Sequence, residues 1–196
     1  MKKTVLYIDG ENLRHYIEKV LQQEGIKKTE TTILNVNLAN LFKKVLKGIR
    51  ITRRVYYMAK LRQHQSSLKK SKLLIAKQRK LKSLLENQGF KFEIVGNVRA
   101  QRITTNGRSK IIFREKGVDV KIAVDLVVAA CEGKVERVIV CSSDSDLQPA
   151  IGEAKKRKLE VIYLGFETNP NKGLIYTCDR AILIRNSEII EAFHNS

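Results

Sequence analysis

Short apolar segments that alternate with helical patterns constrain the fold of this chain more than any other feature of its sequence. The segments are continuous apolar or aromatic runs, which are typical of strands buried on both faces of a sheet. The clearest cover residues 4–8, 54–58, 138–141 and 161–164, and weaker candidates cover residues 90–95 and 181–184. Because strands that alternate with helices form βαβ units, the sequence predicts an α/β fold around a mostly parallel sheet.

Two helices are indicated by the periodicity of their apolar residues. In the first, apolar residues recur at helical spacing on one face, and the helix is expected to end at Gly25. These residues are Leu13, Tyr16, Ile17, Val20 and Leu21. A second, long helix is expected over residues 63–87, with Leu74, Leu81 and Leu85 in its apolar stripe.

A strongly basic and uneven charge distribution indicates a polyanionic partner. The chain has 38 Lys and Arg against 20 Asp and Glu, which gives a formal net charge of +18, and no acidic residue occurs between Glu30 and Glu86. A nucleic acid would relieve the resulting self-repulsion, as would an anionic membrane surface. A charge run is often only a solvated helix face, but the missing counter-charges favour a nucleic-acid footprint.

A basic β-hairpin is expected between residues 99 and 114, where Asn106-Gly107 separates two strand-like runs. Both of its strands carry Lys or Arg, so we expect it to project from the domain and to contact nucleic acid. The candidate phosphate contacts from the acid-free interval and the hairpin region are Arg53, Arg54, Lys69, Lys70, Arg102, Arg108 and Lys116.

Four aspartates stand where an α/β fold places its chemistry. Asp9 directly follows the first expected strand, Asp144 and Asp146 follow a later one, and Asp119 opens an apolar helix. Ligands of an open parallel sheet bind at the carboxyl ends of its strands, so these carboxylates are expected to converge. Converging carboxylates repel one another unless a cation holds them, and oxygen ligands favour Mg²⁺ or Mn²⁺. Such a site suits the hydrolysis of phosphodiesters.

Several of these polar residues also have a structural interpretation, because Asp and Asn commonly cap helices. Asp146 is as well placed to cap the following helix as to bind a cation, and Asn12 is expected to cap the first helix rather than to orient water or phosphate. Asp125 points about 120° away from Asp119 on an ideal helix and is interpreted as a buried acid that supports the site or the fold. Ser142 and Ser143 are expected to support the neighbouring acids.

A single domain spanning residues 1–196 is expected, because this length suits one core and no Pro/Gly/Ser-rich linker or internal repeat divides the sequence. The amino-terminal segment lacks the features of a signal peptide, and no run approaches the roughly 20 apolar residues needed to cross a bilayer. Cys131, Cys141 and Cys178 lack zinc or CxxC spacing, so reduced cysteines in a cytoplasmic protein are expected.

Three motifs occur in order along the chain: Tyr7-Ile8-Asp9-Gly10-Glu11-Asn12-Leu13, Lys116-Gly117-Val118-Asp119-Val120 and Ser142-Ser143-Asp144-Ser145-Asp146-Leu147. Together they resemble the NYN domain of the PIN-like nucleases, and the bacterial LabA-like branch in particular. The resemblance implies a Rossmann-like, PIN-type three-layer sandwich and metal-dependent cleavage of RNA, most simply of single strands. It also implies that Asp9, Asp119, Asp144 and Asp146 bind Mg²⁺ or Mn²⁺ and that Asn12 is an active-site polar residue.

The positions of the histidines also favour metal-dependent cleavage. His15, His64 and His194 all lie outside the three motifs, and a metal-free ribonuclease would need two histidines at its site. Two alternatives remain. One is a nucleic-acid-binding regulatory protein without turnover. The other is a phosphatase of the haloacid dehalogenase type, whose motif normally has a second Asp where this chain has Glu11. The RNA target and the oligomeric state, including a homodimer, are left open by the sequence.

Overall fold

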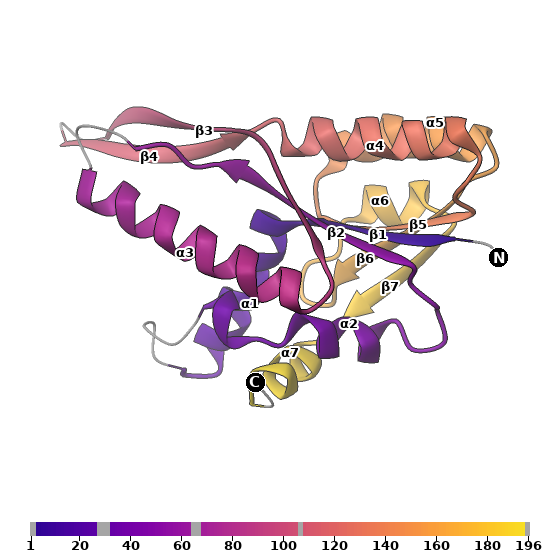
Figure 1. Cartoon of the computed structure of the whole chain (residues 1–196), viewed down its shortest axis with the longest axis horizontal. Coiled ribbons are helices and arrows are strands. Elements are labelled where there is room, and N and C mark those ends of the chain that lie inside the picture. The colour runs from indigo at the N-terminus through magenta and orange to yellow at the C-terminus, as the bar shows by residue number, and fades with distance from the viewer. Residues whose placement is uncertain (1–2, 27–31, 64–67, 106–107, 195–196) are drawn as a thin grey trace.

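A seven-stranded sheet in the order β4-β3-β2-β1-β5-β6-β7 forms the centre of the computed structural model (Figure 1). The structure describes residues 3–26, 32–63, 68–105 and 108–194, and only the backbone at residues 99–105 and 108–115. The strands are β1 (Thr4–Asp9), β2 (Arg53–Lys60), β3 (Lys91–Thr105), β4 (Arg108–Lys116), β5 (Arg137–Cys141), β6 (Glu160–Phe166) and β7 (Arg180–Ile184). All neighbouring pairs are parallel except β3 and β4, which confirms the expected α/β fold.

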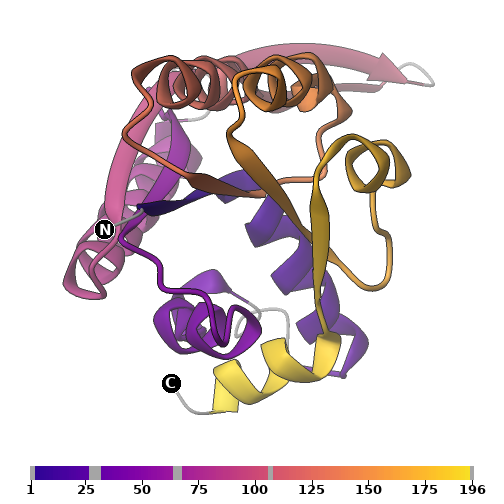
Figure 2. The same ribbon diagram turned by 90° about the vertical axis from the view of Figure 1, so that its right-hand side faces the viewer.

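Helices cover both faces of the sheet and complete the three layers that the resemblance implied (Figures 1 and 2). One face is covered by α4 (Val118–Glu132), α5 (Gln148–Lys156) and α6 (Lys172–Thr177). The other face is covered by α1 (Gly10–Gln23), α2 (Leu38–Val45), α3 (Leu68–Asn87) and α7 (Asn186–His194).

Each central strand supplies apolar side chains to both layers, as its continuous apolar sequence predicts. In β1, Leu6 and Ile8 pack in the layer of α1 and α2, whereas Val5 and Tyr7 pack in the layer of α4 and α5. Successive side chains of a strand point to opposite faces, so an uninterrupted apolar run is needed to fill both layers. The edges and ends of such strands are then the places where polar residues reach solvent.

All six expected strands are present, but β3 is much longer than the sequence indicated. It runs from Lys91 to Thr105, so the expected strand at residues 90–95 and the first strand of the hairpin form one element. The outer half of β3 is paired with β4, from Asn97 opposite Lys116 to Thr105 opposite Arg108. The expected hairpin is therefore confirmed, while its turn residues, Asn106 and Gly107, lie outside the described part of the chain.

Gly96 lies at an irregularity in the pairing of β3 with β2, one residue before the pairing with β4 begins at Asn97. Its φ is +62°, and a Cβ at this position would lie 2.1 Å from the carbonyl oxygen of Lys116. Only glycine tolerates both this backbone conformation and this approach. The hairpin beyond it, residues 97–105 and 108–116, is called the arm below; it extends well past the body of the sheet, beside the amino-terminal half of α3 (Figure 1).

The two expected helices are also present. Leu13, Ile17, Val20 and Leu21 of α1 are buried, and Tyr16 at the edge of this face stacks on Phe166. The long helix α3 begins at Leu68 instead of residue 63, and residues 64–67 lie outside the described chain.

The long helix is fixed to the sheet by more than its apolar stripe. Leu81 and Leu85 are buried and Leu74 is half-buried. The buried amide of Gln78 donates a 2.8 Å hydrogen bond to the carbonyl oxygen of Ala59 in β2.

Within the described residues, no helix is long and apolar enough to span a membrane.

Candidate metal centre

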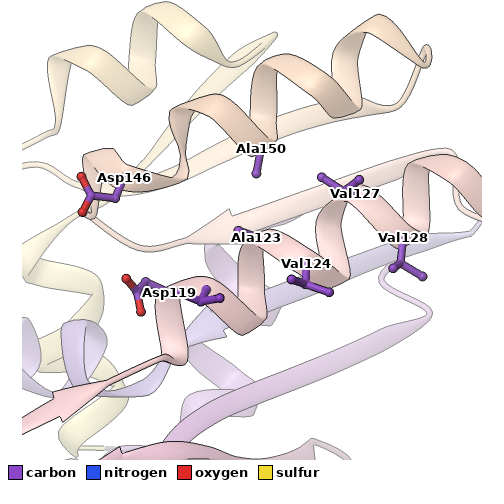
Figure 3. Close-up of a pocket in the computed structure, with 8 residues that line it drawn as sticks. Asp119, Ala123, Val124, Val127, Val128, Asp146 and Ala150 are labelled. Carbon is purple, nitrogen blue, oxygen red and sulfur yellow. The ribbon is translucent and has the colours of Figure 1, made fainter.

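Three aspartates come together at the carboxyl edge of the sheet. Asp119 lies in the first turn of α4, whereas Asp144 and Asp146 lie after β5, where residues Ser145–Leu147 form the 3₁₀ turn η3. One carboxylate oxygen from each lies within 4.8 Å of the other two. Figure 3 shows the carboxylates of Asp119 and Asp146 extending to the same side, at the ends where α4 and α5 begin. These three residues are called the acidic cluster below.

The local backbone explains why these side chains face one another. Gly117, with a φ of +90°, turns the chain from β4 into α4 and leaves Asp119 in the exposed first turn. In η3, Asp144 accepts a 2.9 Å hydrogen bond from the backbone N–H of Asp146. The expectation that Asp146 caps the following helix is wrong, because η3 intervenes and the residue before α5 is Leu147, which offers no side-chain cap. Asp146 is exposed and therefore free to face the cluster.

Asp9 is buried and does not belong to the acidic cluster. It is 8% exposed, and its oxygens are not among those of the described acids that lie within 4.8 Å of one another. Its Oδ1 accepts a 3.0 Å hydrogen bond from the backbone N–H of Asn12, so Asp9 is the cap of α1. The capping role expected for Asn12 is wrong, because β1 passes directly into α1 and the helix begins two residues earlier.

Hydrogen bonds join Asp9 to the segment that carries the acidic cluster. Ser142, which is fully buried, donates a 3.2 Å hydrogen bond to Oδ2 of Asp9 and accepts one of 3.1 Å from the backbone N–H of Asp144. The side-chain oxygen of Asn12 accepts a 3.3 Å hydrogen bond from the backbone N–H of Ser143. The first and third sequence motifs are thus joined at two points, which the parallel pairing of β1 with β5 makes possible.

The ionisation of Asp9 is disfavoured by its surroundings. Burial is the main cause that raises the pKa of Asp9 above its usual 3.8. Hydrogen bonds from Asn12 and Ser142 oppose this rise, and the charges of Asp144 and Glu11 add to it. A cation bound near these carboxylates would favour the ionised form of Asp9.

Gly10, directly after Asp9, is required by the close approach of β2. A Cβ on Gly10 would lie 2.3 Å from the ring of Tyr56 and 2.6 Å from the backbone oxygen of Tyr57. The hydroxyl of Tyr56 in turn donates a 3.0 Å hydrogen bond to the carbonyl oxygen of Gly10. The Asp-Gly pair therefore belongs to the packing of β1 against β2 as well as to the site.

Glu11 is held by basic residues of its own helix. Burial alone would raise the pKa of Glu11, but hydrogen bonds and charges from Arg14 and His15 outweigh it and lower the pKa. Arg14 bridges Glu11 and Glu18 through ion pairs of 2.5 Å and 2.6 Å. Glu11 is thus already neutralised, unlike the acids of the cluster.

Asp125 supports the fold on the side of α4 that faces the sheet. It is half-buried, accepts a 2.8 Å hydrogen bond from the hydroxyl of Tyr57, and forms an ion pair with Lys121. Among the described residues, none of its hydrogen bonds reaches the acidic cluster. Of the two roles considered for Asp125, the geometry favours the structural one.

The candidate phosphate contacts are spread over two ends of the molecule. Arg53 and Arg54 begin β2 beside Val5 and Leu6, roughly 10 to 13 Å along the strand from the level of Asp9. The guanidinium of Arg54 lies 5.6 Å from the ring centre of Phe90, so part of it is engaged in packing. Neither arginine lies at the carboxyl edge.

The other candidate phosphate contacts lie on the arm and α3. Lys69 and Lys70 are exposed at the start of α3, and Lys116 is exposed at the end of β4, three residues before Asp119. The side chains of Arg102 and Arg108 lie outside the described residues, although their strands belong to the arm.

Asn171 is a residue near the site that the sequence did not single out. Its amide nitrogen donates a 2.9 Å hydrogen bond to the carbonyl oxygen of Ser143, while its Oδ1 caps α6 by accepting from the N–H of Leu174. Its backbone N–H donates to the hydroxyl of Tyr163 at 3.0 Å. The only local signal is that of an ordinary helix cap, so its link to the third motif was not visible in the sequence.

The donors of the acidic cluster fit a hard divalent cation. All are carboxylate oxygens, which Mg²⁺ and Mn²⁺ prefer. Among the side chains that the structure describes, no Lys, Arg or His forms an ion pair with Asp119, Asp144 or Asp146. Three mutually close carboxylates without a counter-charge are the arrangement that a bound cation stabilises.

An open groove of about 540 Å³ runs from the acidic cluster between α4 and α5. Asp119 and Asp146 stand at one end of it, and the remaining lining residues are valines and alanines (Figure 3). The groove is therefore apolar over most of its length, with the negative charges of Asp119 and Asp146 at one end.

Comparison with known proteins gives one family and one fold. The sequence model of the NYN domain matches residues 3–185. Among solved structures, a protein of unknown function from Vibrio parahaemolyticus RIMD 2210633 is similar, with a TM-score of 0.60, 18% identity and coverage of 93% of each chain. At this identity the similarity concerns the fold alone. The sequence has no significant match among curated proteins.

Proposed function

Because the chain belongs to the NYN domain family of PIN-like nucleases, we propose that it is a metal-dependent ribonuclease that hydrolyses phosphodiester bonds in single-stranded RNA. We further propose that it belongs to the LabA-like branch, because of its three sequence motifs. The observation that carries the proposal is the acidic cluster, in which oxygens of Asp119, Asp144 and Asp146 lie within 4.8 Å of one another at the carboxyl edge of the sheet.

The chain's own residues have distinct parts in this proposal. Asp119, Asp144 and Asp146 would hold Mg²⁺ or Mn²⁺, and Asp9 would join them as a ligand or through Ser142, with which it shares a 3.2 Å hydrogen bond. When bound, such a cation lowers the pKa of a water molecule and neutralises charge on phosphoryl oxygens.

The polar residues around the acids would position them and the substrate. Ser142 holds the carboxylate of Asp9 and the backbone of Asp144 in place, and Asn171 holds the carbonyl of Ser143. Asn12, at the carboxyl edge, is a further group that could orient water or phosphate. Direct in-line attack of water leaves a 5′-phosphate and a 3′-hydroxyl, with no covalent link between RNA and protein.

The arm and α3 are the proposed binding surface for the RNA backbone. Residues 99–114 contain five Lys or Arg and no Asp or Glu, and exposed lysines begin α3. Both elements extend from the body of the molecule side by side (Figure 1). An RNA strand held along them would reach the carboxyl edge, where Lys116 begins the second motif.

A single experiment tests the activity: purified protein is incubated with end-labelled single-stranded RNA or DNA, in Mn²⁺, in Mg²⁺ or in excess chelator. We expect RNA to be cleaved only with the metal present, and the products to carry a 5′-phosphate. Cleavage in excess chelator, or products ending in a 2′,3′-cyclic phosphate, would contradict the mechanism. RNA that is bound but never cut would identify a regulatory binding protein.

The phosphatase alternative is not favoured by the geometry around Glu11. This residue occupies the position of the second catalytic Asp in such enzymes, but it is engaged with Arg14 and His15. Hydrolysis of a small phosphomonoester in the same assay series, without cleavage of RNA, would restore that alternative.

A further inference from the structure

Helix α4 is apolar on the side that faces solvent as well as on the side that faces the sheet. Its inner face is buried through Val118, Ile122, Leu126, Ala129 and Ala130. On its outer face, Val120, Val124 and Val128 are 60%, 50% and 45% exposed. A helix that is apolar all round is normally buried all round. The outer face of α4 therefore has the composition of an interface that a single copy of the chain does not cover.

The outer face has the spacing of a helix-pairing seam. Val120, Val124, Val127 and Cys131 follow one another at intervals of four, three and four residues, as the inward positions of a heptad repeat do. Val127 is half-buried against α5 and Cys131 is exposed. The groove between α4 and α5 runs beside this seam and presents further apolar surface (Figure 3).

The groove beside the seam is unsuited to holding a nucleic-acid backbone. Apart from Asp119 and Asp146 at one end, it is lined by valines and alanines and offers phosphate no basic side chain. The basic side chains described on α3 lie in the layer on the opposite face of the sheet. A protein surface, and not the RNA backbone, fits this face.

A second copy of the same helix complements the seam. If two copies of α4 pair antiparallel about a twofold axis between Val124 and Val127, Val124 of one copy meets Val127 of the other, and Val120 meets Cys131. Lys121 and Glu132 border the seam on the same side, about 20° apart around the helix, and within one copy they pair with Asp125 and Lys134. The antiparallel pairing would bring Lys121 of each copy near Glu132 of the other. Apolar pattern and flanking charge are thus both self-complementary.

We propose that the chain forms a twofold-symmetric homodimer through the outer face of α4 and the adjoining groove. The dimer has an unusual salt dependence, because each copy carries a formal charge of +18 and the copies repel one another at long range. Added salt screens this repulsion while leaving the apolar contact intact, so dimerisation strengthens between low and moderate salt. Association bridged by nucleic acid would respond in the opposite way.

The test is the mass in solution of nuclease-treated protein, measured by analytical ultracentrifugation at about 0.1 and 0.5 M NaCl over a range of concentrations. Wild-type protein should have twice the 22.4 kDa chain mass. Val124→Glu should be monomeric at the same concentrations, because the symmetry places two buried, unpaired carboxylates in the interface. The matched control is Leu73→Glu, the same kind of change at an exposed apolar residue of α3 (57% exposed), which should leave the dimer intact.

The readout also separates loss of association from loss of folding. Both variants change side chains that are at least half exposed, so their circular dichroism and melting temperature should match those of wild type. A wild-type protein that is monomeric at both salt concentrations overturns the proposal. So does a Val124→Glu variant that still dimerises, or a dimer that dissociates as salt is raised.

Discussion

Asp144 combines a structural and a chemical role in one side chain. Its Oδ1 accepts the hydrogen bond that starts η3, and its carboxylate belongs to the acidic cluster. Replacement by Asn retains an oxygen that can cap η3 but removes the negative charge. We expect Asp144→Asn to lose more than the roughly 10- to 100-fold in activity that is typical of residues which only support a metal ligand.

The Asp144→Asn substitution should affect RNA binding differently from RNA cleavage. Because Asp144→Asn removes a negative charge near the phosphate, RNA affinity should be unchanged or higher. Gel-shift and cleavage assays on the same RNA measure both quantities. Glu153→Gln, which neutralises an exposed acid on α5 that pairs with Arg157, is the control and should cleave at the wild-type rate. Full activity of Asp144→Asn would remove this residue from the site.

The buried carboxyl group of Asp9 should make the stability of the folded protein depend on pH. The folded-state pKa of Asp9 is raised, chiefly by burial, above the 3.8 of the unfolded chain. The folded state then binds more protons than the unfolded state between these two pKa values, so this group lowers stability as pH rises through the folded pKa. The penalty is absent below pH 3.8 and complete above the raised pKa.

We therefore expect Asp9→Asn to be more stable than wild type at neutral pH in chelator, although it should be inactive. The Asn side chain can still cap α1, so the gain is not offset by a lost cap. Melting temperatures across a pH series should show the difference between the two proteins growing as pH rises and then becoming constant. A variant that is less stable than wild type at every pH would show that the charge of Asp9 is satisfied in the folded protein.

Among the elements, the arm is the one whose deletion should weaken RNA binding without abolishing RNA cleavage. Its first strand stops pairing with β2 after Asn97, and its second strand leads through Gly117 into α4, which carries Asp119. Because Val98 pairs with Glu115, an Asn-Gly turn can join these two residues and delete residues 99–114. The deletion removes five basic residues and no acidic one.

The shortened protein should bind single-stranded RNA more weakly and with a flatter salt dependence. Each phosphate contact contributes about 0.7 to the slope of log affinity against log salt, so loss of five contacts would lower the slope by up to roughly 3.5. Cleavage at saturating RNA should persist. As a control for net charge, Lys134, Lys156 and Arg157 on the α4–α5 side are changed to Gln, which should leave the slope unaltered. An unchanged slope in the shortened protein would exclude the arm from the interface.

At the scale of the whole molecule, the two hydrophobic layers share one sheet, so we propose that residues 1–196 unfold as one domain. Both layers take side chains from the same central strands. Thermal unfolding should therefore show one transition by circular dichroism and by calorimetry. Two separated transitions would indicate two domains.

Binding of a divalent cation should shift that transition. At a concentration 100 times the dissociation constant, a ligand of the folded state adds about 2.7 kcal/mol, which for a chain of this size raises the melting temperature by roughly 5 to 10 °C. Asp144→Asn should lose most of the shift. Comparison of MnCl₂ with NaCl at equal ionic strength controls for the screening of the +18 charge. An equal shift with both salts would mean that Mn²⁺ acts by screening alone.

The sequence by itself determined the class of fold, the strands and the position of the acids along the chain. The apolar runs of β1, β2, β5 and β6 specify buried strands, because a strand covered on both faces needs side chains for both layers. Placement of Asp9, Asp119, Asp144 and Asp146 at element ends followed from the same pattern. These are local properties, set by residues a few positions apart.

Only the tertiary structure decided which groups meet. It assigned the cap of α1 to Asp9 instead of Asn12, because the direct passage from β1 into α1 fixes where the helix begins. It placed Arg54 against Phe90 at the far end of β2 from the acids, and brought Asn171 to Ser143 from 28 positions away. Such contacts depend on strand register and on the order of strands in the sheet, which bring together residues that have no local signal of their proximity.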